Sequence, residues 1–290
     1  MNPLLIVGHG TKSEVGVAEF GQLVEQVRRL VPYADIDGGF LELSPPPIQD
    51  AVAKLAPAHP VIDVVPLVLV AAGHSKGDIP AALEREKVRH VGLAFRYSRP
   101  LGPHPLLLTA LADRLEAVVA RELWPQTAVV LVGRGASDPD ANAEVARTAR
   151  LLQEGRGIGT VETAFISLAE PGVSAGLERA RRLGYRRLVV LPWFLFAGVL
   201  PDRIAQQTER WAHAHPDVEV ALAGPIGPVE ALARVVAERW AELDQGDIRM
   251  NCDTCIYRIA MPGFEGRVGA PQEPHDHPDD PAHPHVHGRL

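Results

Sequence analysis

Gly8-His9-Gly10-Thr11 follows the apolar run Leu4-Leu5-Ile6-Val7, and a second corner, Gly73-His74-Ser75, follows the apolar run from Val64 to Val70. Short apolar runs that are rich in β-branched residues and end in glycine are typical of buried strands of a parallel sheet. A histidine directly after such a strand lies at the edge where open α/β sheets bind their ligands. The two corners therefore predict a parallel sheet with two histidines at one edge.

The chain contains an internal repeat with a constant offset. When it is slid by 125 positions, Gly8-His9-Gly10 aligns with Gly133-Arg134-Gly135, and each triplet follows an apolar run. Further pairs with this offset are Phe40 and Phe165, Leu43 and Leu168, Pro46 and Pro171, Gly73 and Gly198, and Leu101-Gly102-Pro103 and Ile226-Gly227-Pro228. A constant offset through strand ends, prolines and glycines predicts duplication of one domain.

Each half of the repeat predicts alternating strands and helices. In the first half, strands are expected at 4–7, 36–43, 61–70 and 90–97, with helices near 20–30, 48–55, 80–86 and 106–123. In the second half, strands are expected at 128–132, 161–168, 188–196 and 218–223. Such alternation implies a parallel sheet covered by helices on both faces. The prediction is an α/β protein with two tandem domains, 1–124 and 125–244, a cleft between them, and a tail from 245 to 290.

Composition restricts the classes of function. The 290 residues are 46% hydrophobic and 22% charged, which is typical of a soluble globular protein. The net charge of −7 argues against nucleic acid or an anionic membrane surface as a partner. No apolar run approaches the roughly 20 residues that span a bilayer. The start, Met1-Asn2-Pro3, has no basic segment and no cleavage-like motif, so a cytoplasmic location is expected.

The sequence changes character beyond Leu243. A linker, Asp244-Gln245-Gly246-Asp247, leads into Met250-Asn251-Cys252-Asp253-Thr254-Cys255 and then into a tail rich in proline, histidine and aspartate. The tail has too few apolar residues to fold alone, so we expect it to be disordered. The chain's two cysteines form one Cys-x-x-Cys, which excludes a disulfide framework and favours a metal or redox role in a reducing compartment.

Positions at which the two copies of the repeat carry different residues indicate where a functional site lies. The three differences are His9 against Arg134, Glu42 against Ser167, and His74 against Val199. Ligand-type side chains therefore stand only in the first half, at the ends of three strands. Two imidazoles and a carboxylate suit a first-row divalent metal with open coordination positions. A single histidine after a strand is more often a hydrogen-bonded structural residue, but three matched positions favour a metal or acid/base site. Phosphate-binding turns at the two Gly-x-Gly triplets are a weaker alternative.

Three motifs resemble those of the class II chelatases. They are Gly8-His9-Gly10-Thr11, Phe40-Leu41-Glu42 before a proline-rich helix start, and the run from Ala72 to Ile79. Within that family the chain resembles the long-form sirohydrochlorin cobaltochelatases of the anaerobic cobalamin pathway. Those proteins have two fused chelatase domains, a Met-x-Cys-x-x-Cys motif and a histidine-rich region. Here Met250 to Cys255 matches the motif, whereas the histidines lie C-terminal to it.

The resemblance implies ATP-independent insertion of Co²⁺ into sirohydrochlorin, with loss of two pyrrole N–H protons. His9 and His74 would hold the metal through neutral imidazoles, and these groups or Glu42 would accept the protons. Glu42 completing the metal site is an equal alternative. The substrate carries eight carboxylates. The cations placed to receive them are Lys12, Lys76, Arg134 and Arg203. For Arg134 an ordinary surface ion pair is an alternative. The first domain is expected to be catalytic and the second to shape the cleft.

The resemblance also implies a [4Fe–4S] cluster on Cys252 and Cys255. Such a cluster needs about four ligands, so a homodimer would pool two cysteine pairs, or exogenous thiols would complete the set. A thiol/disulfide pair and a zinc site with tail histidines are alternatives. The histidine-rich tail is interpreted as a cobalt store, or else as a solvated segment with incidental metal affinity.

Two other functions compete with the cobalt enzyme. A sirohydrochlorin ferrochelatase of siroheme synthesis would use the same three ligand-type residues with Fe²⁺. A non-catalytic metal-storage protein or metallochaperone would keep the fold and lose the activity. The intact His9, Glu42 and His74 argue against the second of these, and the histidine-rich tail favours cobalt over iron.

Overall fold

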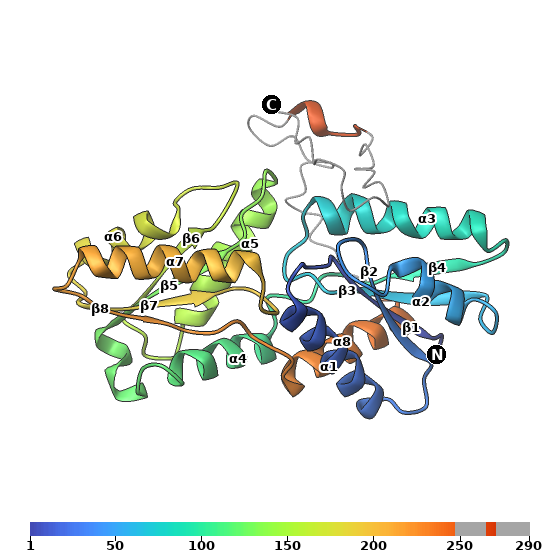
Figure 1. Cartoon of the computed structure of the whole chain (residues 1–290), viewed down its shortest axis with the longest axis horizontal. Coiled ribbons are helices and arrows are strands. Elements are labelled where there is room, and N and C mark those ends of the chain that lie inside the picture. The colour runs from blue at the N-terminus through green and yellow to red at the C-terminus, as the bar shows by residue number, and fades with distance from the viewer. Residues whose placement is uncertain (247–264, 271–290) are drawn as a thin grey trace.

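The structure is a computed structural model in which residues 1–246 and 265–270 are described, except for the side chains of His74 and Gln245. Two parallel four-stranded sheets lie side by side (Figure 1). The first has the order β2-β1-β3-β4, with β1 Leu4–Gly8, β2 Ile36–Phe40, β3 Val61–Pro66 and β4 Ala94–Tyr97. The second has the order β6-β5-β7-β8, with β5 Thr127–Gly133, β6 Thr160–Phe165, β7 Arg187–Pro192 and β8 Glu219–Leu222. The predicted duplicated α/β fold is confirmed.

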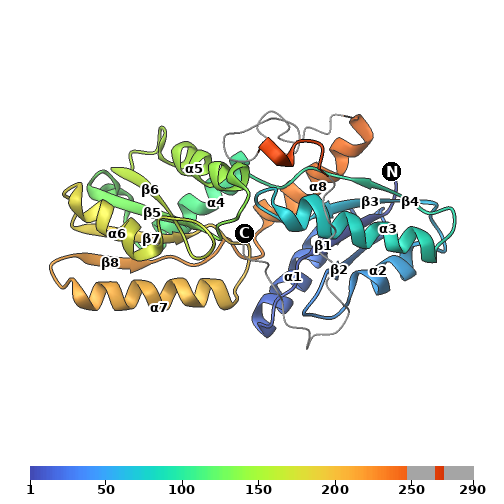
Figure 2. The same cartoon turned by 90° about the horizontal axis from the view of Figure 1, so that it is seen from above.

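Helices cover both faces of each sheet. The α-helices are α1 Glu14–Leu30, α2 Ile48–Leu55, α3 Ile79–Arg89, α4 Pro105–Glu116, α5 Pro139–Gln153, α6 Val173–Arg182, α7 Val199–Ala214 and α8 Glu230–Gln245. Shorter helical turns are η1 His74–Asp78, η2 Arg121–Gln126 and η3 Glu265–Arg267. The two lobes also lie side by side when the molecule is viewed from above (Figure 2).

The central strands explain why the sheets are buried on both faces. Successive strand residues point to opposite faces. In β1, Leu4 and Ile6 therefore join one core, and Leu5 and Val7 join another, formed with α2 and α3. All four side chains are fully buried. A near-continuous apolar run is the sequence pattern that such a two-sided position requires.

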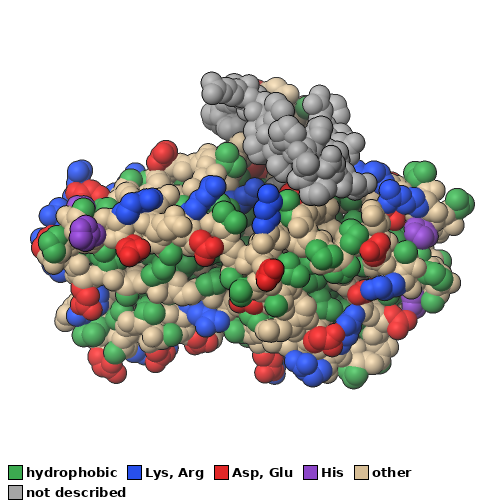
Figure 3. All heavy atoms as spheres, in the orientation of Figure 1, with side chains coloured by type: hydrophobic (Ala, Val, Ile, Leu, Met, Phe, Trp, Pro, Cys, Tyr) green, Lys and Arg blue, Asp and Glu red, His purple; other side chains and the backbone are tan. Residues whose placement is uncertain are grey.

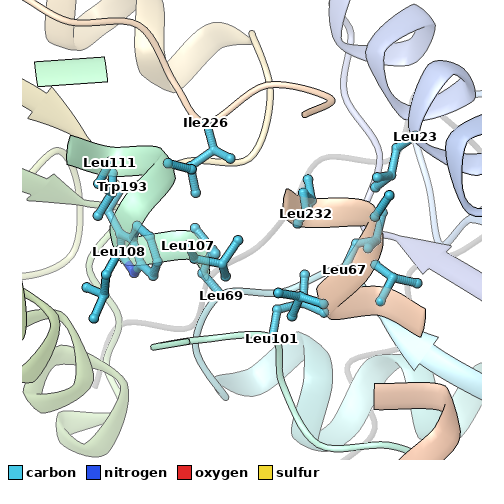
Figure 4. Close-up of a cluster of buried hydrophobic side chains, with 14 of the residues drawn as sticks. Leu23, Leu67, Leu69, Leu101, Leu107, Leu108, Leu111, Trp193, Ile226 and Leu232 are labelled. Carbon is cyan, nitrogen blue, oxygen red and sulfur yellow. The ribbon is translucent and has the colours of Figure 1, made fainter. Parts of the chain in front are cut away.

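The last helix of each half packs on the sheet of the other half. The buried leucines of α4 face β7 and α5 in the second half, whereas α8 packs beside α1 and over β3 in the first half. Figure 1 shows α4 under the second sheet and α8 beside α1. As a result, one continuous apolar core includes Leu23 and Leu67 of the first half together with Trp193 of the second (Figure 4). The domain boundaries 1–124 and 125–244 stay a prediction.

Polar contacts fix α8 to the first sheet. The Asp63 carboxylate in β3 is fully buried and accepts hydrogen bonds from Trp240 Nε1 at 3.1 Å and from Arg96 Nε and Nη2 at 2.6 Å each. Arg96 also donates to Asp244 near the end of α8, at 2.6 Å. A buried carboxylate is stable only when it is paired and hydrogen-bonded, and here the helix of the second repeat supplies part of that pairing.

The duplication is visible in the backbone as well. Gly10 and Gly135 both have positive φ, at 109° and 85°, and so do Leu43 and Leu168, at 64° and 59°. Cis peptide bonds occur at Pro45-Pro46 and at Glu170-Pro171. Each of these pairs is separated by the 125-residue offset found in the sequence. The repeat is therefore conserved in local geometry, including geometry that few residues adopt.

Several elements are shorter than their sequence patterns suggested. β2 ends at Phe40 and β6 at Phe165, three residues before the expected ends, because the chain turns sharply at the two leucines with positive φ. β3 and β7 end at prolines, which lack the N–H that a longer ladder needs. The helix expected to reach residue 123 ends at Glu116 and is followed by η2. Apolar runs predict burial, and here burial continues beyond the hydrogen-bonded strand.

Surface properties agree with the composition. On the face shown in Figure 3, acidic and basic side chains are interspersed over both lobes outside the grey segment. No helix within residues 1–246 and 265–270 is long and apolar enough to cross a membrane.

Candidate functional site

The first glycine-histidine corner brings a histidine and a carboxylate together. Beyond the paired ends of β1 and β2, Leu41 N donates to Gly8 O at 2.9 Å and Glu42 N donates to His9 O at 3.0 Å. This continued pairing places His9 Nε2 3.1 Å from Glu42 Oε1, with 28% of the His9 and 13% of the Glu42 side chain exposed. The pair is thus largely shielded while its imidazole stays accessible, as a metal or proton-transfer site requires.

The second glycine of the corner has a steric explanation. A Cβ at Gly10 would lie 1.8 Å from Glu42 O, and its φ of 109° disfavours any side chain. In the second half, a Cβ at Gly135 would lie 1.8 Å from Ser167 O. Glycine is therefore required because another backbone segment passes directly over it. This close approach explains the second glycine of each Gly-x-Gly triplet without a phosphate.

His74 begins η1, a single turn of π-helix between β3 and α3. Because β1 lies between β2 and β3, the ends of three adjacent strands carry His9, Glu42 and the η1 turn at one edge of the sheet. The side chain of His74 is not described, so its meeting with the other two stays a prediction. Among the described residues, no group of three His, Cys, Asp or Glu side chains is arranged for a metal ion. π-turns of this kind often occur at functional sites.

Lys76, which the sequence suggested as a substrate cation, lies in a buried ion cluster. Its ammonium is 2.6 Å from Asp138 Oδ2 and 3.3 Å from Asp140 Oδ2, and the three side chains are 6%, 9% and 2% exposed. Asp138 also caps α5 by accepting from Asp140 N at 3.1 Å. In this conformation Lys76 therefore joins the η1 turn of the first half to the start of α5 in the second.

Arg134 interacts electrostatically with Glu42 of the first half. It is exposed, yet desolvation by the surrounding protein lowers the pKa of its guanidinium, and the Glu42 carboxylate partly opposes this shift. Lys12 and Arg203 are exposed, the former between β1 and α1 and the latter in α7. Their contact with substrate stays a prediction.

A second junction also joins the two halves. Ala197 N donates to Glu19 Oε2 at 2.7 Å, and a Cβ at Gly16 would lie 2.5 Å from Ala197 O. The loop after β7 therefore touches α1, much as the η1 turn after β3 touches α5. Sequence reasoning missed Glu19, Asp138 and Asp140. The one available signal was that Asp138 aligns with Ser13 at the 125-residue offset, and both cap a helix.

Two hollows open elsewhere, the first lined by residues of the second half and the second lined by residues of both halves. One of about 480 Å³ lies beside Tyr185 and Arg187, and one of about 490 Å³ lies beside Trp124 and Arg156. Neither of these two is lined by a predicted site residue. Cys252, Cys255 and the histidine-rich tail lie outside the described residues, so the predicted cluster, the dimer through these cysteines and the cobalt store are not tested.

The fold and the corner define a two-lobed α/β protein whose ligand-type residues are concentrated in one lobe. The CbiX family model matches residues 3–118 and again residues 128–243. The chain belongs to the CbiX family, with two copies of its domain.

Relatives of known sequence support this assignment. The chain is 34% identical over 270 residues to a sirohydrochlorin cobaltochelatase of Priestia megaterium, covering 90% of this chain and 86% of the relative. It is 28% identical over 240 residues to a sirohydrochlorin ferrochelatase of the same species, covering 82% and 89%.

Solved structures have the same fold. SirB from Bacillus subtilis with Fe³⁺ superimposes with a TM-score of 0.72 at 28% identity, covering 87% of this chain and 100% of that one. The sirohydrochlorin chelatase SirB from Bacillus subtilis subspecies spizizenii in complex with cobalt gives 0.70 at 26% identity, covering 86% and 99%.

Proposed function

We propose that this chain is a sirohydrochlorin cobaltochelatase, which inserts Co²⁺ into sirohydrochlorin without ATP. The observation that carries the proposal is the His9–Glu42 pair, 3.1 Å apart at the strand ends of the first half, in a chain that is similar to a cobaltochelatase over 90% of its length. The corresponding residues of the second half, Arg134 and Ser167, are not metal ligands of the usual kind.

The proposed chemistry needs metal binding, desolvation and proton removal. His9 and His74 hold the metal through neutral imidazole nitrogens and later release it to the macrocycle. Two pyrrole N–H bonds break as the four ring nitrogens bind the metal, and the two displaced protons pass to the imidazoles or to Glu42. Glu42 accepts a proton directly or through His9, or completes the metal site. Its hydrogen-bond distance from His9 suits either role.

In the same proposal, Arg134 receives substrate carboxylates on the wall opposite Glu42, because a guanidinium pairs with them in bidentate fashion. Lys12 and Arg203 are exposed cations for the same purpose. Lys76 would need to leave Asp138 and Asp140 before it contacted substrate. We therefore assign Lys76 to substrate only in an opened form of the interface.

A ferrochelatase with Fe²⁺ is the second candidate, and it is favoured by the similarity to a relative with that name and to SirB with Fe³⁺. The discriminating experiment incubates the purified protein anaerobically with sirohydrochlorin and either Co²⁺ or Fe²⁺. Insertion is followed by the change in absorbance. Preferred acceleration with Co²⁺ supports the proposal, and preferred acceleration with Fe²⁺ replaces it by the ferrochelatase. No acceleration over the spontaneous reactions leaves a metal-binding protein.

The [4Fe–4S] cluster stays part of the proposal. One chain offers two thiolates, Cys252 and Cys255, whereas a cluster takes about four ligands, so the remaining ligands come from a second copy or from small thiols. Anaerobically purified protein is expected to be brown and to contain iron and sulfide. A colourless protein without iron would exclude the cluster, and a monomer that contains it would exclude bridging.

The tail is proposed to raise cobalt supply at low concentration. A chain ending at Tyr257 is expected to keep chelatase activity but to have lower metal loading at limiting cobalt. Equal metal loading of the full and shortened chains at limiting cobalt contradicts the role as a store.

A further inference from the structure

Two leucines have a backbone conformation that leucine rarely adopts. Among the described residues, Leu43 and Leu168 are the non-glycine residues with positive φ, at 64° and 59°. Ser44 N donates to Glu42 O at 2.8 Å, and Ala169 N donates to Ser167 O at 2.7 Å. Each leucine is therefore the central residue of a γ-turn with positive φ, a turn that is uncommon and strained for residues with a side chain.

The same two leucines expose a large apolar surface. Leu43 is 38% and Leu168 is 66% exposed. A glycine would adopt this turn without the steric penalty, and a polar residue would leave less apolar surface in water. Folding alone therefore does not explain a leucine here. Both halves keep it, although the preceding residue differs, Glu42 in one half and Ser167 in the other.

The turns lie at the candidate site. Leu43 directly follows Glu42, the partner of His9, and its Cβ lies 3.5 Å from the position that a Cβ at Gly10 would occupy. Leu168 directly follows Ser167, whose N–H donates to Arg134 O at 2.9 Å. The Glu42 carboxylate partly opposes the lowering of the Arg134 pKa, so residues beside the two turns influence one another electrostatically.

We propose that Leu43 and Leu168 are substrate-positioning residues that pack against the planar ring of the tetrapyrrole, one from each half. A flat macrocycle with carboxylates at its edge has an apolar ring surface, and covering that surface with aliphatic side chains removes it from water. Two exposed aliphatic side chains beside the ligand-type residues supply that contact. This inference rests on the proposed function, since it takes the substrate to be a tetrapyrrole.

The γ-turn itself gives the leucines their direction. An extended residue after β2 or β6 would continue along the sheet, where its neighbours are buried. The positive φ turns the chain at that point and leaves each side chain exposed at the edge of its own sheet. Leu43 lies beside His9 and Glu42, and Leu168 lies beside Arg134 and Ser167. The strain is retained because the side chain must project there.

The test uses Leu43→Gly and Leu168→Gly in the full chain. Matched controls are Leu30→Gly and Leu183→Gly, which remove leucines that are 38% and 60% exposed at helix ends away from the corner. Binding of metal-free sirohydrochlorin is measured by its fluorescence, and KM and kcat are measured for insertion. The thermal midpoint is measured for every variant.

Leu43→Gly and Leu168→Gly are each expected to weaken sirohydrochlorin binding and to raise KM about tenfold. This is the effect expected when the partial burial of one leucine side chain against the substrate is lost. We expect kcat to stay within about twofold, since the metal ligands are intact. The thermal midpoint is expected to hold or rise, because glycine relieves the strained φ. The controls are expected to bind as the wild type does. The proposal is overturned if Leu43→Gly and Leu168→Gly both bind sirohydrochlorin as the wild type does. If their thermal midpoint also falls while binding is unchanged, the leucines have a structural role instead.

A second pair of variants covers the case in which glycine disturbs the turn. Asparagine tolerates positive φ but is polar, whereas methionine is apolar and of similar size. Leu43→Asn is expected to bind weakly and Leu43→Met to bind nearly as the wild type does. Equal binding by both contradicts an apolar contact. If the wild type neither binds nor metallates sirohydrochlorin, the proposed function fails. If it turns over and the leucine variants match it, only the leucine proposal fails.

Discussion

The Lys76 ammonium in the η1 turn lies 2.6 Å from the Asp138 carboxylate at the start of α5, so a buried ion pair joins the two halves beside the candidate site. Asp140 completes the cluster at 3.3 Å. Two carboxylates around one ammonium, all at most 9% exposed, make this junction sensitive to the loss of charge.

Each carboxylate removed from this cluster is expected to lower the free energy of unfolding further. Asp138→Asn keeps a capping side chain on α5 but removes one charge, and it is expected to destabilise by about 1.5–3 kcal/mol. Adding Asp140→Asn removes the second of these two carboxylates from the buried ammonium and should cost about 3–5 kcal/mol in total. Urea unfolding measures both. Glu84→Gln, at an exposed ion pair with Lys87, is the control and should change stability by less than about 1 kcal/mol. Equal effects in all three would contradict a buried cluster.

The asymmetry between the halves predicts unequal effects on catalysis. His9→Ala and Glu42→Gln are each expected to lower the rate of cobalt insertion by roughly 100-fold or more, the usual contribution of a proton-transfer group. Arg134→Ala is expected to raise KM with a smaller effect on kcat, since it acts on substrate carboxylates. Steady-state kinetics with Co²⁺ and sirohydrochlorin decide this. Normal insertion by His9→Ala with loss of activity in Arg134→Ala would reverse the roles of the halves.

His104 makes the folded state sensitive to pH. Its Nδ1 caps α4 by accepting from Leu106 N at 3.2 Å, and its Nε2 lies 2.9 Å from Glu238 Oε2. Burial lowers the pKa of His104 below its ordinary value of 6.5, and Glu238 partly opposes this. The unfolded chain therefore binds the proton more readily than the folded one, so stability should fall as pH decreases below 6.5 towards the lowered folded value.

The measurement is the free energy of unfolding against pH, for the wild type and for His104→Asn. Asparagine keeps a capping acceptor but does not titrate. The difference in stability between the two proteins is expected to shrink or reverse as pH falls through this window. A difference that stays constant from pH 8 to pH 5 would show that His104 does not titrate on unfolding.

The exchange of helices predicts that neither half folds alone. A fragment of residues 1–124 lacks α8, so the apolar face around α1 and β3 and the buried Asp63 lose their cover. It is expected to be unfolded or aggregated, and mixing it with residues 125–246 during refolding should restore a soluble complex. Circular dichroism and size-exclusion chromatography check this. Cooperative unfolding of residues 1–124 as a monomer would contradict it.

The predicted strand ends were accurate where apolar residues stop and inaccurate where the backbone turns. The run at residues 36–43 predicts a strand through Leu43, yet β2 ends at Phe40 because a γ-turn follows. A local pattern of apolar residues predicts which positions are buried, but it does not predict the backbone angle φ at those positions. The meeting of His9 with Glu42 followed from the rule that neighbouring parallel strands end at one edge.

The sequence by itself determined the duplicated α/β architecture, the glycines of the corners and the concentration of ligand-type residues in the first half. These follow from the periodicity of apolar residues and from the 125-residue offset, which are properties of neighbouring positions in the chain. Only the tertiary structure decided that α4 and α8 exchange sheets, that Lys76 pairs with Asp138, and that Leu43 and Leu168 are exposed with positive φ. Those features depend on contacts between residues far apart in sequence, or on a backbone turn that leucine does not favour, and neither is recorded in a local pattern.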